Sequence, residues 1–423
     1  MYQRTNLSNN LRIVSHPVKD RESVALGFWV GVGGRYEEDC IKGAAHFLEH
    51  IVFKGSKKYR RDQIKELIEG VGGTLNAFTS EEQTCYYAKI PAKHLEQTLD
   101  VLTDMVFEPT IASEEVAKEK TVIAEEIKMY HDLPQYYVLE LFDGLVWPNH
   151  PLGKSLTGTQ QSVGRIQKKD LGDFHRTHYT PGNVVVSACG AIDHARLVRL
   201  LQKRLGKLAG SRQSTFLKAD NTQPQPRAHF FKKDTEQMHL ALGMLGYDEN
   251  NTDRYALSLL SIVLGGNMSS RLFNEVREKR GLAYSISSST KSLHDTGVFM
   301  VHAGVDNQKI VETIEIVLKE LAKVKSRGVT GDEFRRAKDY LKGQLLLALE
   351  DTLDHMLWIG ETTISRDKFI PLAAVIKAID QFAPKDLQRV AKEILQEEKL
   401  NLAVVGQVSS EQEKRLNELL GLG

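Results

Sequence analysis

The stretch G-A-A-H-F-L-E-H-I-V-F-K-G, residues 43–55, decides how the rest of the chain is interpreted. It contains helix formers and core residues and no proline, so it predicts a helix. On a helix, His46 and His50 lie one turn apart on the same face. Two imidazoles at that spacing can bind one zinc ion. Glu49 would then lie beside the open coordination position, where a carboxylate can act as a general base.

A third ligand has to come from elsewhere, because a catalytic zinc site usually has three protein ligands and water. The pattern H-x-x-E-H alone arises by chance on the order of a few per cent of the time in such a chain. The stretch E-E-V-A-K-E-K-T-V-I-A-E-E-I-K-M-Y-H-D, residues 114–132, predicts a helix with Glu119 and Glu126 two turns apart on one face. Glu126 is the candidate third ligand, although a Glu-rich helix by itself is more often a solvated face.

The pattern H-x-x-E-H and Glu126 within E-K-T-V-I-A-E-E-I, 126 − 50 = 76 residues after His50, together resemble the pitrilysin/insulinase-type zinc peptidases. The resemblance is to their shorter branch, the β-subunit of mitochondrial processing peptidase and bacterial processing proteases, and it covers nearly the whole chain. It implies that His46, His50 and Glu126 hold one zinc ion per chain. It also implies that Glu119 supports the site without binding the metal.

Composition limits the classes of function. A chain of 423 residues is too long for one ordinary core, so about two to four domains are expected. The net charge of +1 and the absence of a basic tract argue against nucleic-acid or membrane partners. Three cysteines, without a C-x-x-C pair, favour a reducing compartment, and no signal peptide is recognised, so a cytoplasmic location is predicted. No role is predicted for Cys40, Cys85 or Cys189.

The order of strand and helix patterns predicts an α+β fold in two tandem domains. Each domain is expected to hold a mostly antiparallel sheet with helices on one face. The polar stretch 210–226, with two prolines, predicts a linker. The predicted division is therefore a zinc-binding catalytic domain at 1–209 and a duplicated domain without metal at 227–423.

The duplication rests on matching helices. Setting S-E-E-V-A-K-E-K-T-V-I-A-E-E-I against G-D-E-F-R-R-A-K-D-Y-L-K-G-Q-L places Glu119 opposite Ala337 and Glu126 opposite Gln344. The helix predicted at Arg254–Leu264 contains no His. We infer that only the first copy binds metal, the alternative being a coincidence of helical charge patterns. The resemblance implies a clam shell, in which the two halves enclose a chamber.

Two further groups of residues gain a role only through the resemblance. In S-R-L-F-N-E-V-R-E-K-R-G-L-A-Y-S-I-S, residues 270–287, Arg277 would hold a substrate carbonyl and Tyr284 would donate to the developing oxyanion. Without the resemblance they are a surface Arg and a half-buried strand Tyr. The strand L-N-A-F-T, residues 75–79, resembles the substrate-binding edge of the family, which makes Asn76, Ala77 and Phe78 substrate-binding residues. The pattern alone does not distinguish an edge strand from a central one.

Together these features predict a zinc metalloendopeptidase that cleaves unfolded or extended peptides in a chamber. Members of the family also serve as inactive partner subunits or as scaffolds, and such chains usually lose part of the metal motif. This chain keeps all of it, so a homodimer is predicted. A heterodimer with an inactive partner is the alternative.

Overall fold

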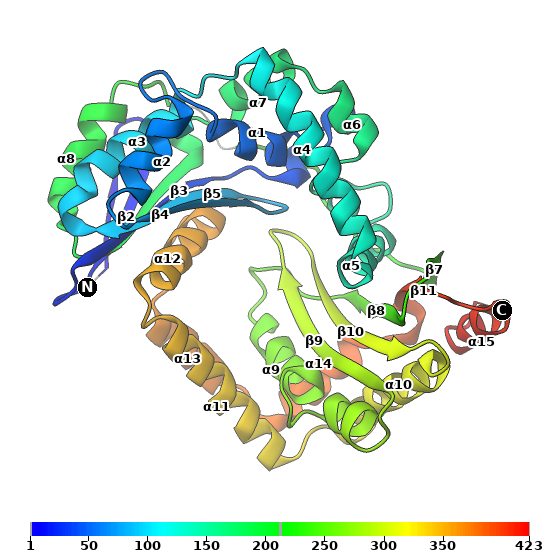
Figure 1. Cartoon of the computed structure of the whole chain (residues 1–423). Coiled ribbons are helices and arrows are strands. Elements are labelled where there is room, and N and C mark those ends of the chain that lie inside the picture. The colour runs from blue at the N-terminus through cyan, green and yellow to red at the C-terminus, as the bar shows by residue number, and fades with distance from the viewer. Residues whose placement is uncertain (1, 211–213, 423) are drawn as a thin grey trace. The chain divides into compact units, whose positions relative to one another are not determined.

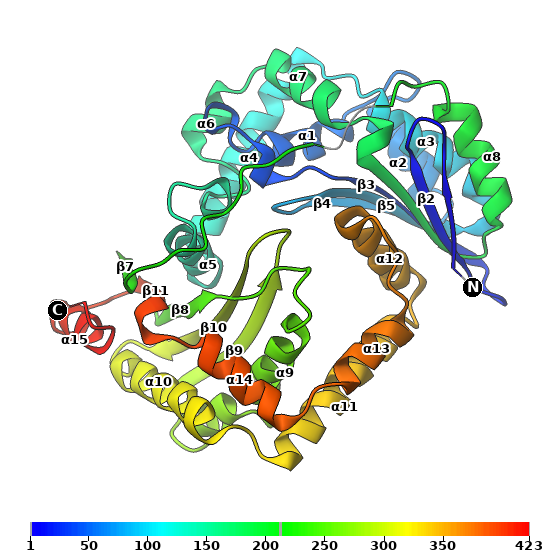
Figure 2. The ribbon, with the colours of Figure 1, turned by 180° about the vertical axis from the view of Figure 1, so that it is seen from behind.

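The computed structural model describes residues 2–210 and 214–422, which form two compact units. Neither unit is continuous in sequence. The first unit comprises Met1–Ile127, Ser155–Leu217 and Leu346–Pro371, and the second comprises Lys128–Lys154, Lys218–Leu345 and Leu372–Gly423. Each unit is built around one sheet (Figures 1 and 2).

The sheet of the first unit has the strand order β1-β2-β6-β3-β5-β4. Its pairs are antiparallel except β2 with β6, which run parallel. Strand β4 pairs only with β5 and therefore forms an edge of the sheet. The strands are β1 (Gln3–Asn6), β2 (Arg12–Pro17), β3 (Ser23–Val30), β4 (Thr74–Thr79), β5 (Thr84–Pro91) and β6 (Val184–Gly190).

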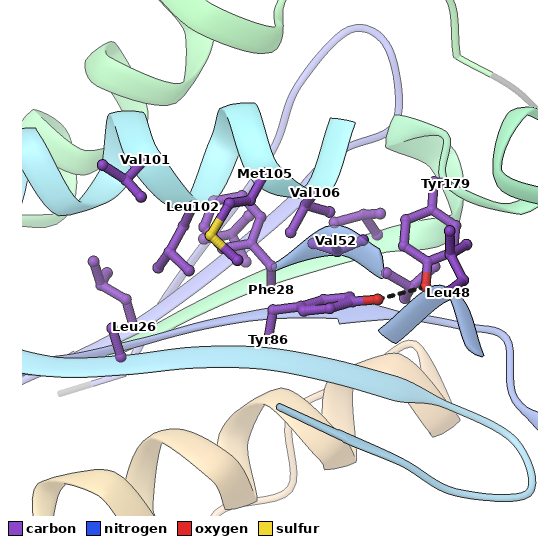
Figure 3. Close-up of a cluster of buried hydrophobic side chains, with 14 of the residues drawn as sticks. Leu26, Phe28, Leu48, Val52, Tyr86, Val101, Leu102, Met105, Val106 and Tyr179 are labelled. Carbon is purple, nitrogen blue, oxygen red and sulfur yellow. Dashed lines mark hydrogen bonds between the residues drawn. The ribbon is translucent and has the colours of Figure 1, made fainter. Parts of the chain in front are cut away.

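One face of this sheet carries the main apolar core of the unit. Alternate residues of β3, such as Leu26 and Phe28, pack under helices, as Figure 3 shows with Val101, Leu102 and Met105. The buried hydroxyl groups of Tyr86 and Tyr179 form a hydrogen bond with each other, with their oxygens 2.8 Å apart. The helices of this unit are α1 (Ala44–Val52), α2 (Arg61–Glu69), α3 (Leu95–Phe107), α4 (Ser113–Asp132, which continues into the second unit), α6 (Gln160–Arg165), α7 (Lys168–His178) and α8 (His194–Leu205).

The opposite face of the same sheet is covered by α12 (Thr352–Arg366), a helix from the second half of the sequence (Figure 1). The other alternate residues of β3, Ala25 and Trp29, pack against Met356 and Ile359 of this helix. Strand β3 is therefore apolar at odd and even positions alike, because both of its faces are buried. Close approach depends on glycine, since a Cβ at Gly360 would lie 1.9 Å from Nε1 of Trp29.

The second unit repeats the strand order of the first. Its sheet runs β7-β11-β8-β10-β9, and β7 with β11 is again a parallel pair. Numbered by position in the chain, both this sheet and the five strands β2 to β6 have the order 1-5-2-4-3. The strands are β7 (Arg227–Lys232), β8 (Gln237–Leu245), β9 (Ala283–Ser292), β10 (Gly297–Asp306) and β11 (Asn401–Gly406).

One face of the second sheet is covered by α5 (Pro134–Val146), a helix from the first half of the sequence. Val138, Phe142 and Val146 of α5 pack with Ala241 of β8 and Val405 of β11. The remaining helices of the unit are α9 (Arg254–Gly265), the π-helix η6 (Phe273–Glu278), α10 (Ile310–Arg327), α11 (Gly331–Ala348), α13 (Leu372–Asp380), α14 (Pro384–Ile394) and α15 (Ser410–Leu419). Helix α9 lies on the other side of the sheet, and α11 and α13 lie beyond α9, away from the strands (Figures 1 and 2).

The α+β class, the two sheets and their mostly antiparallel pairing agree with the prediction from sequence. The structure differs in one respect: each sheet has helices on both faces, and the second face is covered by a helix from the other half of the chain. The compact units therefore differ from the predicted domains at 1–209 and 227–423, because α5 belongs to the second unit and α12 belongs to the first. Helix periodicity indicates an apolar face but not which sheet it will cover.

Of the predicted linker 210–226, residues 211–213 lie outside the described residues, as do residues 1 and 423. Residues 214–226 form no helix or strand. Among the helices that the structure describes, none combines the length and the apolar character needed to cross a membrane.

Candidate metal centre

Helix α1 carries the H-x-x-E-H pattern, and its start is fixed by buried polar contacts. Gly43, the residue before the helix, has φ +97°, and a Cβ there would lie 2.7 Å from the carbonyl oxygen of Thr157. The buried carboxylate of Glu37 accepts hydrogen bonds from the N–H groups of Gly43 (3.0 Å) and Ala45 (2.6 Å). Its Oε2 also lies 3.1 Å from Nζ of Lys42. A carboxylate at this end satisfies free amides and the helix dipole together.

Three side chains converge beside α1. Nε2 of His46 lies 3.7 Å from Oε1 of Glu126, and Nε2 of His50 lies 3.5 Å from Oε2 of Glu126. Each residue offers one ligand atom, and these atoms lie within 4.8 Å of one another. Among the residues that the structure describes, no other group of His, Cys, Asp and Glu meets this condition.

The spacing of these atoms fits a shared cation. Distances of 3.5 and 3.7 Å are longer than good hydrogen bonds between such groups. Tetrahedral ligands that each lie about 2.1 Å from zinc are about 3.4 Å from one another. Two imidazole nitrogens and one carboxylate oxygen are also a donor set that zinc accepts at catalytic sites. The zinc ion predicted from the sequence is therefore compatible with the side chains of His46, His50 and Glu126. Their role as ligands stays a prediction.

Burial favours the neutral forms of the candidate ligands His46 and Glu126, which is the form that a metal requires of His46 but not of Glu126. Burial, and secondarily the neighbouring His50, lowers the pKa of His46 to about 3, so its imidazole is neutral near pH 7. Burial raises the pKa of Glu126, against the opposing effect of His50. Clustering an acidic group with imidazoles in a partly dry site costs free energy in the absence of a cation, which is typical of a functional site.

Glu119 contacts His50, and its supporting role stays a prediction. Its Oε2 lies 3.0 Å from Nδ1 of His50, the ring nitrogen opposite the one that faces Glu126. Its Oε1 forms an ion pair with Nζ of Lys54 at 2.7 Å. A carboxylate on the second nitrogen of a ligand His fixes the tautomer and the orientation of the ring.

Glu49 points toward the edge strand of the sheet. Its Oε2 accepts a hydrogen bond of 2.6 Å from Oγ1 of Thr79, the last residue of β4. Burial raises the pKa of Glu49, and the carboxylate of Glu126 acts in the same direction. The Thr79 hydrogen bond and His50 oppose that shift. A raised pKa suits a group that must take up a proton.

The predicted substrate-binding residues lie on the edge strand β4. Ala77 packs against the main core, while Phe78 packs with Trp29 on the α12 face at a ring-centroid distance of 5.6 Å. The side chain of Asn76 is exposed, and its Oδ1 accepts the backbone N–H of Ala77 at 2.8 Å. An edge strand can pair with an extended peptide, and rotation of Asn76 would release this N–H for that pairing.

Arg277 and Tyr284 belong to the second unit. Arg277 lies on η6, where its guanidinium is 4.8 Å from the ring centroid of Phe273 and 5.7 Å from that of Tyr284. The Tyr284 side chain, on β9, is 74% exposed. An exposed Tyr beside an Arg is available to a ligand, and the roles of both residues stay predictions.

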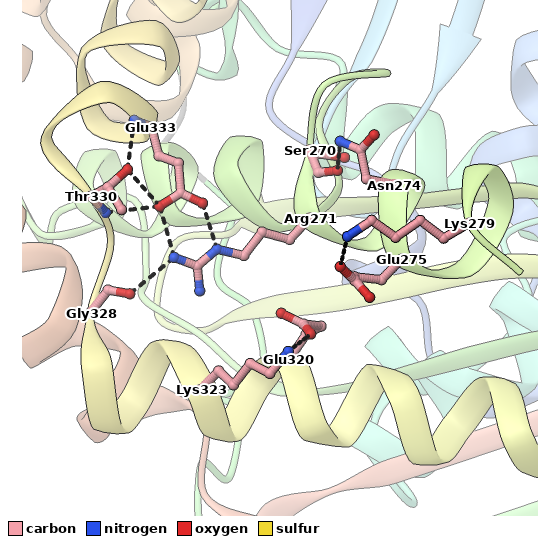
Figure 4. Close-up of polar contacts among 10 residues, drawn as sticks. All are labelled: Ser270, Arg271, Asn274, Glu275, Lys279, Glu320, Lys323, Gly328, Thr330 and Glu333. Atoms are coloured by element: carbon pink, nitrogen blue, oxygen red, sulfur yellow. Dashed lines mark hydrogen bonds and ion pairs between the residues drawn. The ribbon is translucent and has the colours of Figure 1, made fainter.

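The segment before Arg277 is held by a bidentate ion pair (Figure 4). Nε and Nη2 of Arg271 lie 2.7 and 2.8 Å from the two carboxylate oxygens of Glu333, on α11. The same carboxylate accepts the backbone N–H of Thr330, and Arg271 also donates to the carbonyl of Gly328. Bidentate Arg–carboxylate pairs fix orientation as well as position. This contact therefore positions the element that carries Arg277.

The sequence did not predict a role at the site for three residues. These are Glu37, at the start of α1, Lys54, which pairs with Glu119, and Thr79, which bonds to Glu49. Alternation along β4 could have placed Thr79 on the same face as Leu75 and Ala77, toward α1. No sequence signal marks Glu37 as the residue that holds the start of α1, because its partners are mostly backbone amides.

In chain order, helix α9 follows β8 and precedes β9, as α1 follows β3 and precedes β4, the corresponding strands of the repeated order. Helix α9 contains no His. The repeated strand order supports a duplication, while metal binding by the first copy alone stays a prediction.

Comparison with known proteins gives a family. Residues 12–160 match the family described as "Insulinase (Peptidase family M16)", and residues 165–341 match "Peptidase M16 inactive domain". A protein of Streptomyces coelicolor named as an uncharacterized zinc protease is 36% identical, over 98% of this chain and 92% of its own length. A Bacillus subtilis protein named as the uncharacterized zinc protease YmxG is also 36% identical, over 94% of this chain and 97% of its own length.

Solved structures agree with the fold. A protease from Helicobacter pylori superposes with a TM-score of 0.90 at 24% identity, covering 96% of this chain and 99% of the other. A peptidase M16 inactive domain from Pseudomonas fluorescens gives a TM-score of 0.88 at 19% identity, covering 97% and 98%. At identities of 24% and 19%, these structures show the fold alone. The sequence relatives and the matched family models carry the further conclusion that this chain belongs to the insulinase family of peptidases, peptidase family M16.

Proposed function

We propose that the protein is a zinc metalloendopeptidase that cleaves unfolded or extended peptide segments. The observation that carries the proposal is the convergence of His46, His50 and Glu126 at ligand spacing, with Glu49 on the same helix turn. The relatives that are named zinc proteases support the same conclusion.

His46, His50 and Glu126 would hold the zinc ion. Bound there, zinc would supply Lewis-acid polarisation of a peptide carbonyl and a lowered pKa for water. Glu49 takes the proton from the attacking water and passes it to the leaving amine. Glu119 holds the ring of His50 in the orientation and tautomer that binding needs.

The edge strand β4 supports an extended peptide as the substrate. A peptide segment can pair with its free side through main-chain hydrogen bonds, as in β-augmentation. Only a chain without its own stable structure there can present such a segment. Asn76, Ala77 and Phe78 would be the residues along which it pairs.

Arg277 and Tyr284 are proposed to act on the same substrate from the second unit. Arg277 would hold a substrate carbonyl, and Tyr284 would donate to the oxyanion that develops as water attacks. The clam-shell arrangement and the homodimer are proposals from the family resemblance. Gel filtration of the purified protein tests the dimer, and a complex with a different chain is the alternative. The cytoplasmic location rests on the sequence alone.

The proposal is tested by elemental analysis of the purified protein together with cleavage of a quenched fluorescent peptide. We expect about one zinc per chain and cleavage that a chelator abolishes and added zinc restores. Glu49→Gln should keep the zinc and lose turnover, whereas Glu66→Gln, at an exposed position on α2, should keep both. An active Glu49→Gln enzyme would refute the general base. If the protein holds no zinc and cleaves no peptide even after zinc is added back, the result would favour a non-catalytic scaffold.

A further inference from the structure

We propose that Thr79 is a positioning residue for Glu49 and couples this base to the strand on which the peptide pairs. The proposal rests on the proposed function. Its basis is the 2.6 Å hydrogen bond from Oγ1 of Thr79 to Oε2 of Glu49, together with the place of Thr79 at the end of the edge strand β4.

The length of this bond indicates a strong interaction. Hydroxyl-to-carboxylate bonds in which the acceptor is ionised are typically 2.5–2.7 Å long, shorter than those between neutral groups. A carboxylate has two oxygens, and a donor fixed on one of them restricts rotation of the whole group. With Oε2 of Glu49 occupied by Thr79, Oε1 is the oxygen that takes the proton from water.

Thr79 can fix Glu49 only if Thr79 is itself fixed, and the turn after it provides this. The N–H of Ser80 donates to the carbonyl of Gln83 at 2.8 Å, and Oγ of Ser80 bonds to the same carbonyl at 3.0 Å. The carbonyl of Ser80 accepts the N–H of Gly34 at 3.1 Å. A Cβ at Gly33 would lie 2.1 Å from that carbonyl, so the neighbouring backbone packs tightly against the turn.

The turn is also anchored by a buried ion pair. Nη1 of Arg35 lies 2.6 Å from Oε1 of Glu82, with both side chains at most 9% exposed. The backbone N–H of Arg35 donates to the carbonyl of Glu81 at 2.7 Å. The hydroxyl of Thr79 is thus presented to Glu49 by a rigid corner of the sheet.

This arrangement links binding to chemistry. A peptide paired on β4 lies in the register of the strand, and Thr79 sets Glu49 in the same frame. Misplacing a catalytic group by about 1 Å can cost about a hundredfold in rate. The alternative role for Thr79 is structural, because it pairs with Thr84 where the β4–β5 hairpin begins to turn. That role needs the backbone and a β-branched side chain but no hydroxyl.

The test compares Thr79→Val, which keeps the shape and removes the hydroxyl, with Thr79→Ser, which keeps the hydroxyl. For cleavage of the quenched fluorescent peptide, Thr79→Val should lower kcat roughly ten- to hundredfold with KM unchanged. Thr79→Ser should restore most of kcat. The matched control is Thr222→Val, since Thr222 also donates to a carboxylate, that of Asp220, at 2.6 Å, but on an exposed loop of the second unit. It should leave kcat unchanged.

Two readouts do not depend on turnover. The zinc content of Thr79→Val should equal that of the wild type. In the Glu49→Gln background, a fluorescein-labelled peptide of the same sequence should bind with the same Kd whether residue 79 is Thr or Val. A loss of zinc would show that Thr79 supports the metal, and weaker peptide binding would show that it acts through the strand. Either result would overturn the positioning role.

The two proposals fail separately. If the wild-type protein cleaves and Thr79→Val cleaves equally fast, only the positioning role is overturned. If the wild-type protein holds no zinc and cleaves no peptide, the proposed function is wrong, and the positioning role of Thr79 is wrong as well.

Discussion

Oε2 of Glu119 lies 3.0 Å from Nδ1 of His50, while Nε2 of the same ring lies 3.5 Å from Oε2 of Glu126. One imidazole is thus held between two carboxylates of a single helix. The two glutamates are seven residues apart, so α4 presents them two turns apart along one face. With Nδ1 protonated toward Glu119, the lone pair of Nε2 would face the position proposed for zinc.

Glu119→Gln should therefore weaken zinc affinity about 10- to 100-fold without unfolding the protein. The amide is a weaker acceptor for the ring N–H and leaves Lys54 without its ion pair to residue 119. Zinc titration against a competing chelator measures the change. Glu114→Gln, on an exposed position of the same helix, should bind zinc like the wild type. Equal affinities for the two variants would contradict the supporting role of Glu119.

Glu37→Ala should lower the free energy of unfolding by about 3–5 kcal/mol, because it removes one partner of a buried ion pair with Lys42. The amides of Gly43 and Ala45 would also lose their acceptor at the start of α1. Urea unfolding measures the loss. Glu38→Ala, at the exposed neighbouring position, should stay within about 0.5 kcal/mol of the wild type. An unchanged urea midpoint for Glu37→Ala would show that the start of α1 does not depend on this carboxylate.

A pair of histidines should make stability depend on pH. The rings of His16, on β2, and His355, on α12, stack with centroids 4.5 Å apart, and Oη of Tyr2 lies 2.7 Å from Nε2 of His355. Burial, then the neighbouring His355, lowers the pKa of His16 from 6.5 to about 4. The unfolded chain therefore binds this proton at a higher pH than the folded chain does. The contribution of His16 to stability is present above about pH 6.5 and is lost as the pH falls toward 4.

Melting temperatures measured between pH 7.5 and pH 4.5 test this. The His16→Phe variant keeps an aromatic ring without a titrating group, so its melting temperature should fall less across this window than that of the wild type. His229→Phe, at an exposed position on β7, should follow the wild type. Parallel curves for the His16→Phe variant and the wild type would rule out His16 as a source of the pH dependence.

Gly360→Ala should destabilise the protein, although Ala normally stabilises a helix interior by about 1 kcal/mol relative to Gly. The sign reverses because the added Cβ would lie 1.9 Å from Nε1 of the buried Trp29, where α12 meets the sheet. Gly343→Ala on α11 is the control, since a Cβ there meets nothing within 4 Å, and it should be neutral or stabilising. Thermal unfolding of both variants measures the difference. Stabilisation by Gly360→Ala would contradict the close packing of α12.

The sequence alone predicted what depends on residues near one another in the chain. The spacing of His46 and His50 follows from helix geometry, and so does the common face of Glu119 and Glu126. Alternating or continuous runs of apolar residues predicted the strands, and the repeated order of elements predicted two similar domains. Glu126 was a candidate ligand from its place on a predicted helix, but only the family resemblance assigned it to the His pair, because 76 residues separate it from His50.

Tertiary structure decided what depends on contacts between distant segments. Helix α5 covers the second sheet and α12 covers the first, although an amphipathic pattern indicates only that one face of a helix must be buried. The edge position of β4 and the Thr79–Glu49 hydrogen bond likewise follow from strand order and packing. Local periodicity fixes which side chains share a face. The surface that each face covers is selected by the packing of the whole chain, which no short stretch of sequence contains.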